Sequence, residues 1–295
     1  MNRRRFGQLV GAAAMTAPML NLSAAAGTSL QYSTFTKPFR DLGFEETADL
    51  VAEVGWDGVE LPIRESSSHL QPERVEDDLP RMAEALGRRG KRVFIVTTDV
   101  TGIDPVGEKV LRTAAKLGIR KYRLGNLYYD LSQPVAPQLA AIKPRLRELA
   151  ALNAELGMQG AIQNHSGARY VGAPIWDIHE LIHDLDPAVM GICFDIGHAT
   201  LEGGSAWELN WRLMRERFTA VFVKDFAWEK KGDEWKPRWC PLGDGTVNRR
   251  FFKDLLASGF SGIVNQHHEY EHGTGRELIA HCKRDLATLK KWLVA

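Results

Sequence analysis

The sequence has 295 residues, with 38 basic and 37 acidic side chains and a formal net charge of +1. Hydrophobic residues make up 44% of it, an ordinary globular balance with enough apolar material for one substantial core. The near-neutral charge argues against nucleic acid as the main partner, because neutralising phosphates requires a clustered basic surface.

The first 26 residues have the pattern of an export signal. Arg3, Arg4 and Arg5 precede an apolar, alanine-rich run over 9–22, and small residues follow over 23–26. This order is typical of a secretory signal, and the paired arginines resemble the twin-arginine type, which carries folded proteins. We expect cleavage near Ala26, a mature domain over 27–295 and a periplasmic or secreted protein with no stable membrane insertion. An uncleaved N-terminal anchor is the alternative.

From residue 27 onward the chain repeats an apolar, β-branched segment followed by a helical pattern. The predicted strands are 29–33, 58–61, 92–97, 121–124, 158–163, 190–195, 220–224 and 263–267. The predicted helices are 44–54, 78–86, 106–117, 137–156, 176–185, 207–217, 249–257 and 275–293. Eight such units predict an α/β fold, a single-domain (β/α)8 TIM barrel. A doubly wound open sheet is less consistent with the sequence, because residues 33–37 contain no glycine-rich phosphate loop.

In such barrels the functional groups lie at the carboxyl ends of the strands. Glu60 in the second predicted strand is an inward candidate for substrate binding. The fifth strand leads into Gln163, Asn164 and His165, with Gln163 and His165 on one face and Asn164 on the other. These side chains suit orienting sugar hydroxyls or binding a metal, although His165 could also cap the following loop.

The next two strands also end in polar residues. Asp195 follows an apolar run, where a carboxylate needs a partner or a cation. His198 is expected in the adjoining loop, facing the same ligand. Lys224 ends the seventh strand and could hold a substrate oxyanion or act as a base, with pairing to a carboxylate as the alternative.

The last strand and the loop before it add further candidates. His267 and Glu269 share a face if the strand continues, and nitrogen and carboxylate ligands two residues apart suit half of a metal site. The long loop after the seventh strand carries rings that could stack on a sugar or pack against the barrel rim: Trp228, Trp235 and Trp239.

Five motifs, in this order, resemble the sugar phosphate isomerase/epimerase family of the xylose-isomerase-like TIM barrel superfamily. They are GVEL (58–61), FDIGH (194–198), VKD (223–225), PLGDG (241–245) and GFSG (259–262). The resemblance implies one divalent ion at the barrel mouth, held by a Glu, an Asp, a His and a Glu from strands five to eight. The matching positions here are Gln163, Asp195, Phe222 and His267, so only Asp195 keeps the ligand type of the family.

A reduced metal site of Asp195, His267 and Gln163 is therefore expected, with manganese, zinc or cobalt favoured over magnesium. Gln163 cannot act as a base, so proton transfer between two glutamates does not carry over. The residues expected to position and move protons are Lys224, His198 and Glu269. Those expected to bind substrate are Glu60, His165, Asn164 and Trp228.

The sequence thus predicts an exported isomerase- or epimerase-like enzyme that acts on a non-phosphorylated sugar, ketosugar or glycoside by metal-assisted proton transfer. A lyase that cleaves a 3-keto glycoside, and a carbohydrate-binding barrel without catalysis, are the alternatives. The expected partner is a small carbohydrate, not nucleic acid, and a homo-oligomer is compatible with the sequence.

Overall fold

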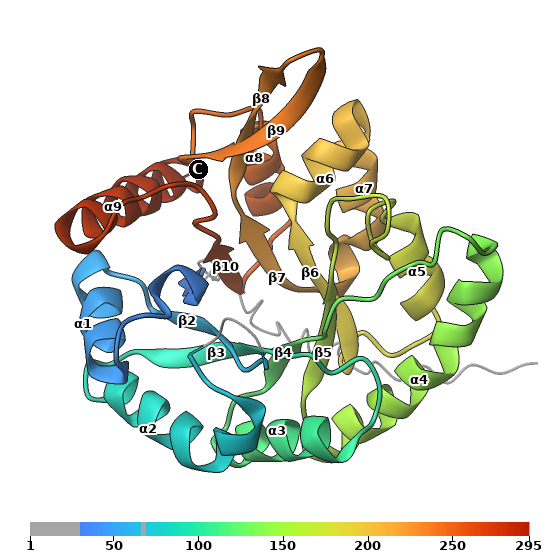
Figure 1. Cartoon of the computed structure of the whole chain (residues 1–295), viewed down its shortest axis with the longest axis horizontal. Coiled ribbons are helices and arrows are strands. Elements are labelled where there is room, and N and C mark those ends of the chain that lie inside the picture. Colours follow the sequence, from blue (N-terminus) through green and yellow to red (C-terminus); the bar gives the residue numbers. More distant parts are fainter. Residues whose placement is uncertain (1–29, 66–68, 295) are drawn as a thin grey trace, which may run out of the picture.

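The computed structural model describes residues 30–65 and 69–294, so the predicted export signal lies outside the described residues. Eight strands close into a parallel barrel in the order β1-β10-β7-β6-β5-β4-β3-β2 (Figure 1). The strands are β1 (Gln31–Phe35), β2 (Gly58–Pro62), β3 (Arg92–Thr97), β4 (Lys121–Arg123), β5 (Gln159–Gln163), β6 (Met190–Asp195), β7 (Phe218–Val223) and β10 (Ile263–Gln266). The predicted (β/α)8 barrel is confirmed.

Helices surround the barrel on the outside (Figure 1). They are α1 (Phe44–Val54), α2 (Val75–Gly87), α3 (Pro105–Lys116), α4 (Val135–Leu156), α5 (Trp176–Ile182), α6 (Ile196–Gly203), α7 (Trp207–Met214), α8 (Arg250–Ala257) and α9 (Gly275–Trp292). Short 3-10 turns are η1 (Lys37–Phe39), η2 (Pro72–Arg74), η3 (Gly204–Ala206) and η4 (Arg215–Arg217). In the described part of the chain, none of the helices combines the length and the apolar character needed to cross a membrane.

Local signals fix many of the helix ends. The Asp104 carboxylate accepts hydrogen bonds from the backbone N–H groups of Val106 (3.0 Å) and Gly107 (2.8 Å), which would otherwise lack partners at the start of α3. Helix α1 ends at Gly55, whose φ of 94° lies in the left-handed region that favours glycine. The predicted bounds of α1 are therefore confirmed.

The core consists of two apolar layers. The larger one fills the space between the strands and the surrounding helices, and the smaller one lies inside the barrel. The inner layer contains Phe94, Ile95, Ala161, Cys193, Ala220, Phe222 and Ile263. A packed interior leaves only the mouth for a ligand, as is usual for this architecture.

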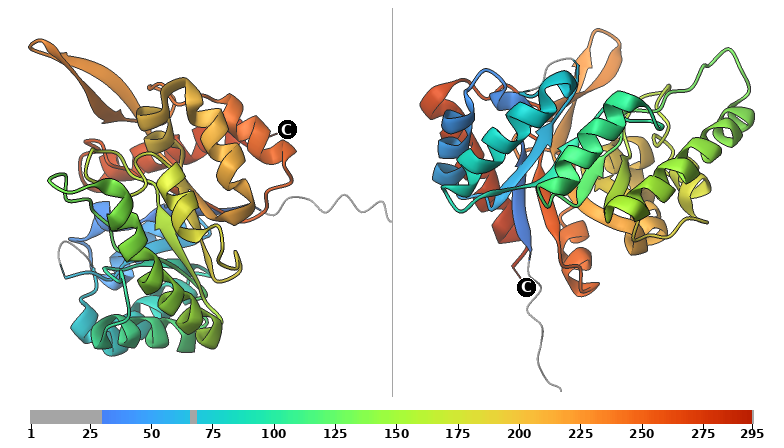
Figure 2. Two further views of the ribbon diagram at one scale, coloured as in Figure 1. Left: turned by 90° about the vertical axis from the view of Figure 1, so that its right-hand side faces the viewer. Right: turned by 90° about the horizontal axis from the view of Figure 1, so that it is seen from below.

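Several predicted bounds differ from the structure by one to three residues; α2, for example, begins three residues earlier than predicted and α5 ends three residues earlier. Strand β1 begins two residues later than predicted, a shift that keeps the same side chains facing inward. The predicted loop after β6 is helix α6, because Asp195 caps its first turn. The predicted long loop after β7 is an antiparallel hairpin of β8 (Asp225–Lys231) and β9 (Glu234–Cys240). Figure 2 shows this hairpin standing out from the body of the barrel.

Candidate active site

Polar side chains from neighbouring strands form a closed ring across the barrel mouth, in which each side chain contacts the next. In order around the ring, they are Glu60, Arg123, Gln163, Asp195, Lys224, Glu269 and His267. All lie at or just beyond the carboxyl ends of β2, β4, β5, β6, β7 and β10. Arg123 was not among the residues predicted from the sequence; the other six were, and the structure brings them together.

Glu60 forms the buried base of this ring. Its Oε2 lies 2.7 Å from His267 Nε2 and also accepts a hydrogen bond from the Asn265 amide, while Thr97 donates to Oε1. Burial disfavours the charged form of Glu60, but His267 and Arg123 outweigh burial and lower its pKa to about 2. Glu60 is fully buried by its protein partners, and its role here is to hold His267 and Arg123 in place.

Gln163 links a cation to an anion. Arg123 donates to Gln163 Oε1 over 2.5 Å, and Gln163 Nε2 donates to Asp195 Oδ2 over 2.8 Å. A guanidinium can only donate, so the amide oxygen must face Arg123 and the amide N–H must face Asp195. Gln163 thus presents a hydrogen-bond donor to Asp195.

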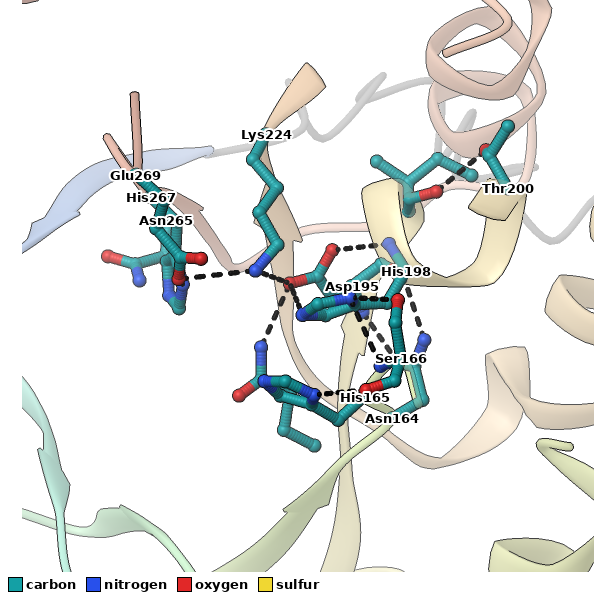
Figure 3. A network of polar contacts seen from close by, with 12 residues as sticks. Asn164, His165, Ser166, Asp195, His198, Thr200, Lys224, Asn265, His267 and Glu269 are labelled. Atoms are coloured by element: carbon teal, nitrogen blue, oxygen red, sulfur yellow. Dashed lines mark hydrogen bonds and ion pairs between the residues drawn. The ribbon is translucent and has the colours of Figure 1, made fainter. Parts of the chain in front are cut away.

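Lys224 lies between two carboxylates (Figure 3). Its Nζ is 3.3 Å from Asp195 Oδ2 and 3.2 Å from Glu269 Oε1, and it faces the Trp239 ring with 4.5 Å to the centroid. Burial favours the neutral form of Glu269, but Lys224 and His267 outweigh burial and hold the pKa of Glu269 well below its usual range. The Glu269 side chain is 27% exposed and that of Asp195 0%, so Glu269 is the carboxylate of this pair that a ligand can reach.

His267 lies between two carboxylates of the ring, Glu60 and Glu269. Burial works against a charged His267 ring, but Glu60 and Glu269 outweigh burial and raise the pKa of His267. Carboxylates and cations therefore alternate around the mouth, with Glu60, Asp195 and Glu269 facing Arg123, Lys224 and His267.

His198 lies in the first turn of α6, not in the predicted loop. Its backbone N–H donates to Asp195 Oδ1 (3.0 Å), and its Nδ1 accepts from the Ser166 N–H (3.2 Å). Burial, followed by the nearby Lys224, lowers the pKa of His198 well below its usual range. Because Nδ1 accepts and the ring is neutral, the proton resides on Nε2.

His198 Nε2 is left over for a ligand. It lies 3.8 Å from Asp195 Oδ2, too far for a hydrogen bond, and has no hydrogen-bond partner within the described ranges. Gly197 makes this arrangement possible, since a Cβ there would lie 2.9 Å from the Lys224 carbonyl oxygen. Ser166, which positions the His198 ring, was not among the residues predicted from the sequence.

Asn164 and His165 support this arrangement from β5. Asn164 Oδ1 accepts from the Asp195 N–H (2.7 Å), and its Nδ2 donates to the Asp195 carbonyl (2.9 Å), so it fixes the end of β6. His165 is stacked between His198 and Tyr170, with 4.1 Å between ring centroids on each side. These two of the four predicted substrate-binding residues therefore lie at the site, where they hold neighbouring groups in position.

Asp225 organises the loop that closes the base of the hairpin. Its carboxylate accepts backbone N–H groups from Phe226 (2.9 Å), Gly243 (3.0 Å), Gly245 (3.2 Å) and Val247 (3.0 Å). A Cβ on Gly245 would lie 2.1 Å from Asp225 Oδ1, so only glycine fits. The VKD motif thus carries both Lys224 and the Asp225 carboxylate. The PLGDG motif supplies two of the backbone N–H groups that Asp225 binds.

The predicted metal ligands do not fit a divalent ion in this arrangement. Asp195 faces the Lys224 ammonium and the N–H of Gln163, and His267 Nε2 is bound to Glu60. Over residues 30–65 and 69–294, no group of three His, Cys, Asp or Glu side chains is placed to hold a metal ion. A cation-facing carboxylate and an amide donor are not ligands that such an ion prefers.

A cavity lies beside the ring, and Glu269 is the ring residue that lines it. Its volume is about 370 Å³, and its other lining residues are Phe35, Lys37, Pro38, Arg40, Asp41, His268, Tyr270 and His272. This volume is in the range of small-molecule sites.

Comparisons with known proteins agree with this fold. A family model described as "Xylose isomerase-like TIM barrel" matches residues 48–292. Among solved structures, a D-tagatose 3-epimerase-like protein superposes with a TM-score of 0.68 at 17% identity, covering 89% of this chain and 97% of that one. D-psicose 3-epimerase from Clostridium cellulolyticum H10 gives a TM-score of 0.67 at 10% identity, covering 90% and 100%. 3-Keto-D-glucoside 4-epimerase from E. coli gives 0.65 at 16%, covering 89% and 100%. No curated protein matches the sequence.

Proposed function

The chain belongs to the xylose isomerase-like TIM barrel family, and we propose that it is an enzyme that moves a proton on the carbon next to a sugar carbonyl. The proposed substrate is a non-phosphorylated sugar, ketosugar or glycoside. The observation that carries the proposal is the meeting of three groups at one point. The Lys224 ammonium contacts both Asp195 and the accessible Glu269 carboxylate, and His198 Nε2, which is buried and unpartnered in the described residues, lies 3.8 Å from Asp195.

Each of these groups has a role in the proposed step. Glu269 takes the proton from the carbon, the C–H electron pair forms a carbon–carbon double bond, and the carbonyl electron pair moves onto the oxygen. Lys224 and the His198 Nε2–H donate to that oxygen as its charge develops. The hydroxyl on the deprotonated carbon then gives its proton to the former carbonyl oxygen, and its O–H electron pair forms the new carbonyl. Glu269 returns its proton to the former carbonyl carbon, which completes an isomerisation.

The exposure of the carboxylates favours chemistry with a single base. The Glu269 side chain is 27% exposed, whereas Asp195 and Glu60 are 0% exposed, and the two donors Lys224 and His198 are 2% and 1% exposed. Inverting a carbon centre by direct proton exchange needs acid–base groups on both faces, but transfer between adjacent carbons on one face needs one. We therefore favour isomerisation over two-base epimerisation. Elimination from a 3-keto glycoside, the lyase alternative, would use the same base.

Members of this family commonly use divalent metals. The positive charge that such an ion would supply next to the substrate oxygen is present here on Lys224, with Arg123 and His267 farther back in the ring. The manganese, zinc or cobalt expected from the sequence is therefore not part of the proposed step. The step runs on the side chains of this chain.

The test is solvent exchange in D2O followed by proton NMR, with ketohexoses and 3-keto-D-glucosides as candidate substrates. We expect the wild-type protein to replace the proton next to the carbonyl of at least one of them with deuterium. Glu269→Gln should slow this exchange about 100-fold or more, and Lys224→Met about 100- to 1,000-fold. Lys236→Ala, on the outer side of the hairpin, is the control and should leave the rate unchanged. Exchange that persists in Glu269→Gln, or that no candidate supports, would contradict the proposal.

A further inference from the structure

The β8–β9 hairpin has two chemically different faces. Residues paired across an antiparallel ladder share a face, and faces alternate along each strand. The pairs that share the inner face are Phe226–Trp239, Trp228–Pro237 and Lys230–Trp235. Those that share the outer face are Ala227–Arg238, Glu229–Lys236 and Lys231–Glu234. One face is thus mainly aromatic and the other mainly charged.

The aromatic face runs from the site to the tip of the hairpin without a break. At its base, the Trp239 ring lies 4.5 Å from Lys224 Nζ and 5.2 Å from the His198 ring centroid, edge to face. One step farther out, Trp228 meets Phe226 at 5.7 Å between ring centroids. Trp235 is the outermost ring. Successive pairs on one face are about 6.8 Å apart, so the three tryptophans span about 14 Å.

The outer two rings, Trp228 and Trp235, are not buried in the core. Trp228 is 47% exposed and Trp235 63% exposed, whereas Trp56, Trp207 and Trp211 are buried. The two rings line an open hollow by themselves. Apolar rings left in water on a projecting hairpin need a partner, because exposed aromatic surface of this kind marks a binding site.

We propose that this aromatic platform, Trp239, Trp228 and Trp235, binds the second ring of a glycoside whose carbonyl-bearing sugar lies at Lys224 and Glu269. The occupant follows from continuity, since the platform begins on the ring that covers Lys224 and leads outward from it. Sugar rings present an apolar C–H face that stacks on tryptophan. The inference rests on the proposed function and narrows its substrate class from free monosaccharides to glycosides of at least two rings.

The first experiment measures binding without catalysis. Cellotriose is titrated into the full chain by calorimetry, with glucose as the single-ring comparison. We expect the affinity for cellotriose to fall about 10-fold or more in the Trp228→Ala/Trp235→Ala variant and to stay unchanged in Glu229→Ala/Lys236→Ala. The control pair lies on the outer face of the same hairpin, so it reports any general loss of hairpin structure.

The second experiment measures turnover. Solvent exchange should show kcat/KM for a 3-keto disaccharide falling about 10-fold in the tryptophan variant, with the value for free 3-keto-D-glucose unchanged. If cellotriose binding depends on the tryptophans but nothing is turned over, the platform stands and the proposed function fails. Turnover of both substrates with no dependence on the tryptophans would overturn the platform and leave the function standing. Light scattering that shows a dimer lost in the tryptophan variant, with cellotriose binding unchanged, would also overturn it.

Discussion

At the scale of single residues, the chemistry of the mouth depends on which charges face one another. The family resemblance places a carboxylate where Gln163 stands and an imidazole where Phe222 stands. Phe222 instead packs under His267, with 4.5 Å between ring centroids. Gln163 joins Arg123 to Asp195, and Lys224 lies against the far side of Asp195. The side chains at these two positions thus contact other members of the ring, Phe222 through the His267 ring and Gln163 through Arg123 and Asp195.

Gln163→Glu should therefore destabilise the protein. The change replaces an N–H donor 2.8 Å from Asp195 with a second carboxylate oxygen, so that two like charges meet in a buried site. We expect the free energy of unfolding to fall by about 1–3 kcal/mol, measured by urea denaturation. Gln133→Glu, which changes an exposed glutamine away from the ring, is the control and should leave the free energy of unfolding nearly unchanged. If the free energy of unfolding of Gln163→Glu is unchanged or higher, the amide N–H of Gln163 does not face Asp195 as described.

Asp285, which is not a member of the ring at the mouth, should make the stability of the protein depend on pH. It accepts hydrogen bonds from the Tyr270 hydroxyl (2.7 Å) and the Leu242 N–H (3.2 Å), and burial raises its pKa from 3.8 to about 6. The folded state therefore binds this proton more tightly than the unfolded state. The resulting stability is present below about pH 4 and is lost as the pH rises to about 6, by up to about 3 kcal/mol.

Asp285→Asn should remove this pH dependence. The free energy of unfolding is measured by urea denaturation at pH 4.5 and pH 7.5. The value for the variant minus that for the wild type should be higher at pH 7.5 than at pH 4.5. Asp233→Asn, an exposed aspartate in the hairpin turn, should leave the difference between the two pH values unchanged. A wild-type protein whose unfolding responds to pH in the same way as the Asp285→Asn variant would contradict the assignment.

At the scale of elements, the sequence predicted the repeated units well and the additions to them poorly. Helix α1 has the predicted bounds, because its glycine signal is local. Helix α6 was missed, since its first turn depends on capping by Asp195, which was assigned to a ligand role. The hairpin was missed because β9 contains Pro237 and many charges, a composition that does not resemble a buried strand.

The loop at the base of the hairpin should depend on Asp225. Asp225→Ala leaves the backbone N–H groups of Gly243, Gly245 and Val247 without their acceptor. We expect a loss of about 2–4 kcal/mol in the free energy of unfolding and faster proteolytic cleavage within 225–247. Asp244→Ala, whose exposed carboxylate pairs with Arg284, should have a much smaller effect. Equal cleavage rates for the two variants would show that Asp225 does not hold this loop.

At the scale of the whole molecule, alternating strands and helices were enough to predict the barrel, because the period of the apolar residues is a local property. The positions of the candidate residues followed from the rule that strand ends meet at one mouth. Their partners did not follow. The contact of Lys224 with Asp195 depends on the pairing of β6 with β7, and the contact of Glu60 with His267 depends on β1 lying between β2 and β10.

The N-terminal segment allows a prediction about the destination of the chain. We propose that the protein is exported through the twin-arginine route. Changing Arg3, Arg4 and Arg5 to lysine keeps the charge, so a general secretory signal should still function, but twin-arginine recognition should be lost. Cell fractionation should then find the variant in the cytoplasm and the unchanged chain outside it. Equal export of both would rule out this route.

The central claim is that a ring of ion pairs, and not a bound metal, supports proton transfer at the barrel mouth. The most direct test measures metal content by plasma mass spectrometry, with solvent exchange on the same sample before and after chelator treatment. The protein should be purified without a metal-binding tag. We predict far less than one metal per chain and an exchange rate that chelation does not change. A stoichiometric metal whose removal abolishes exchange, and whose return restores it, would contradict the claim.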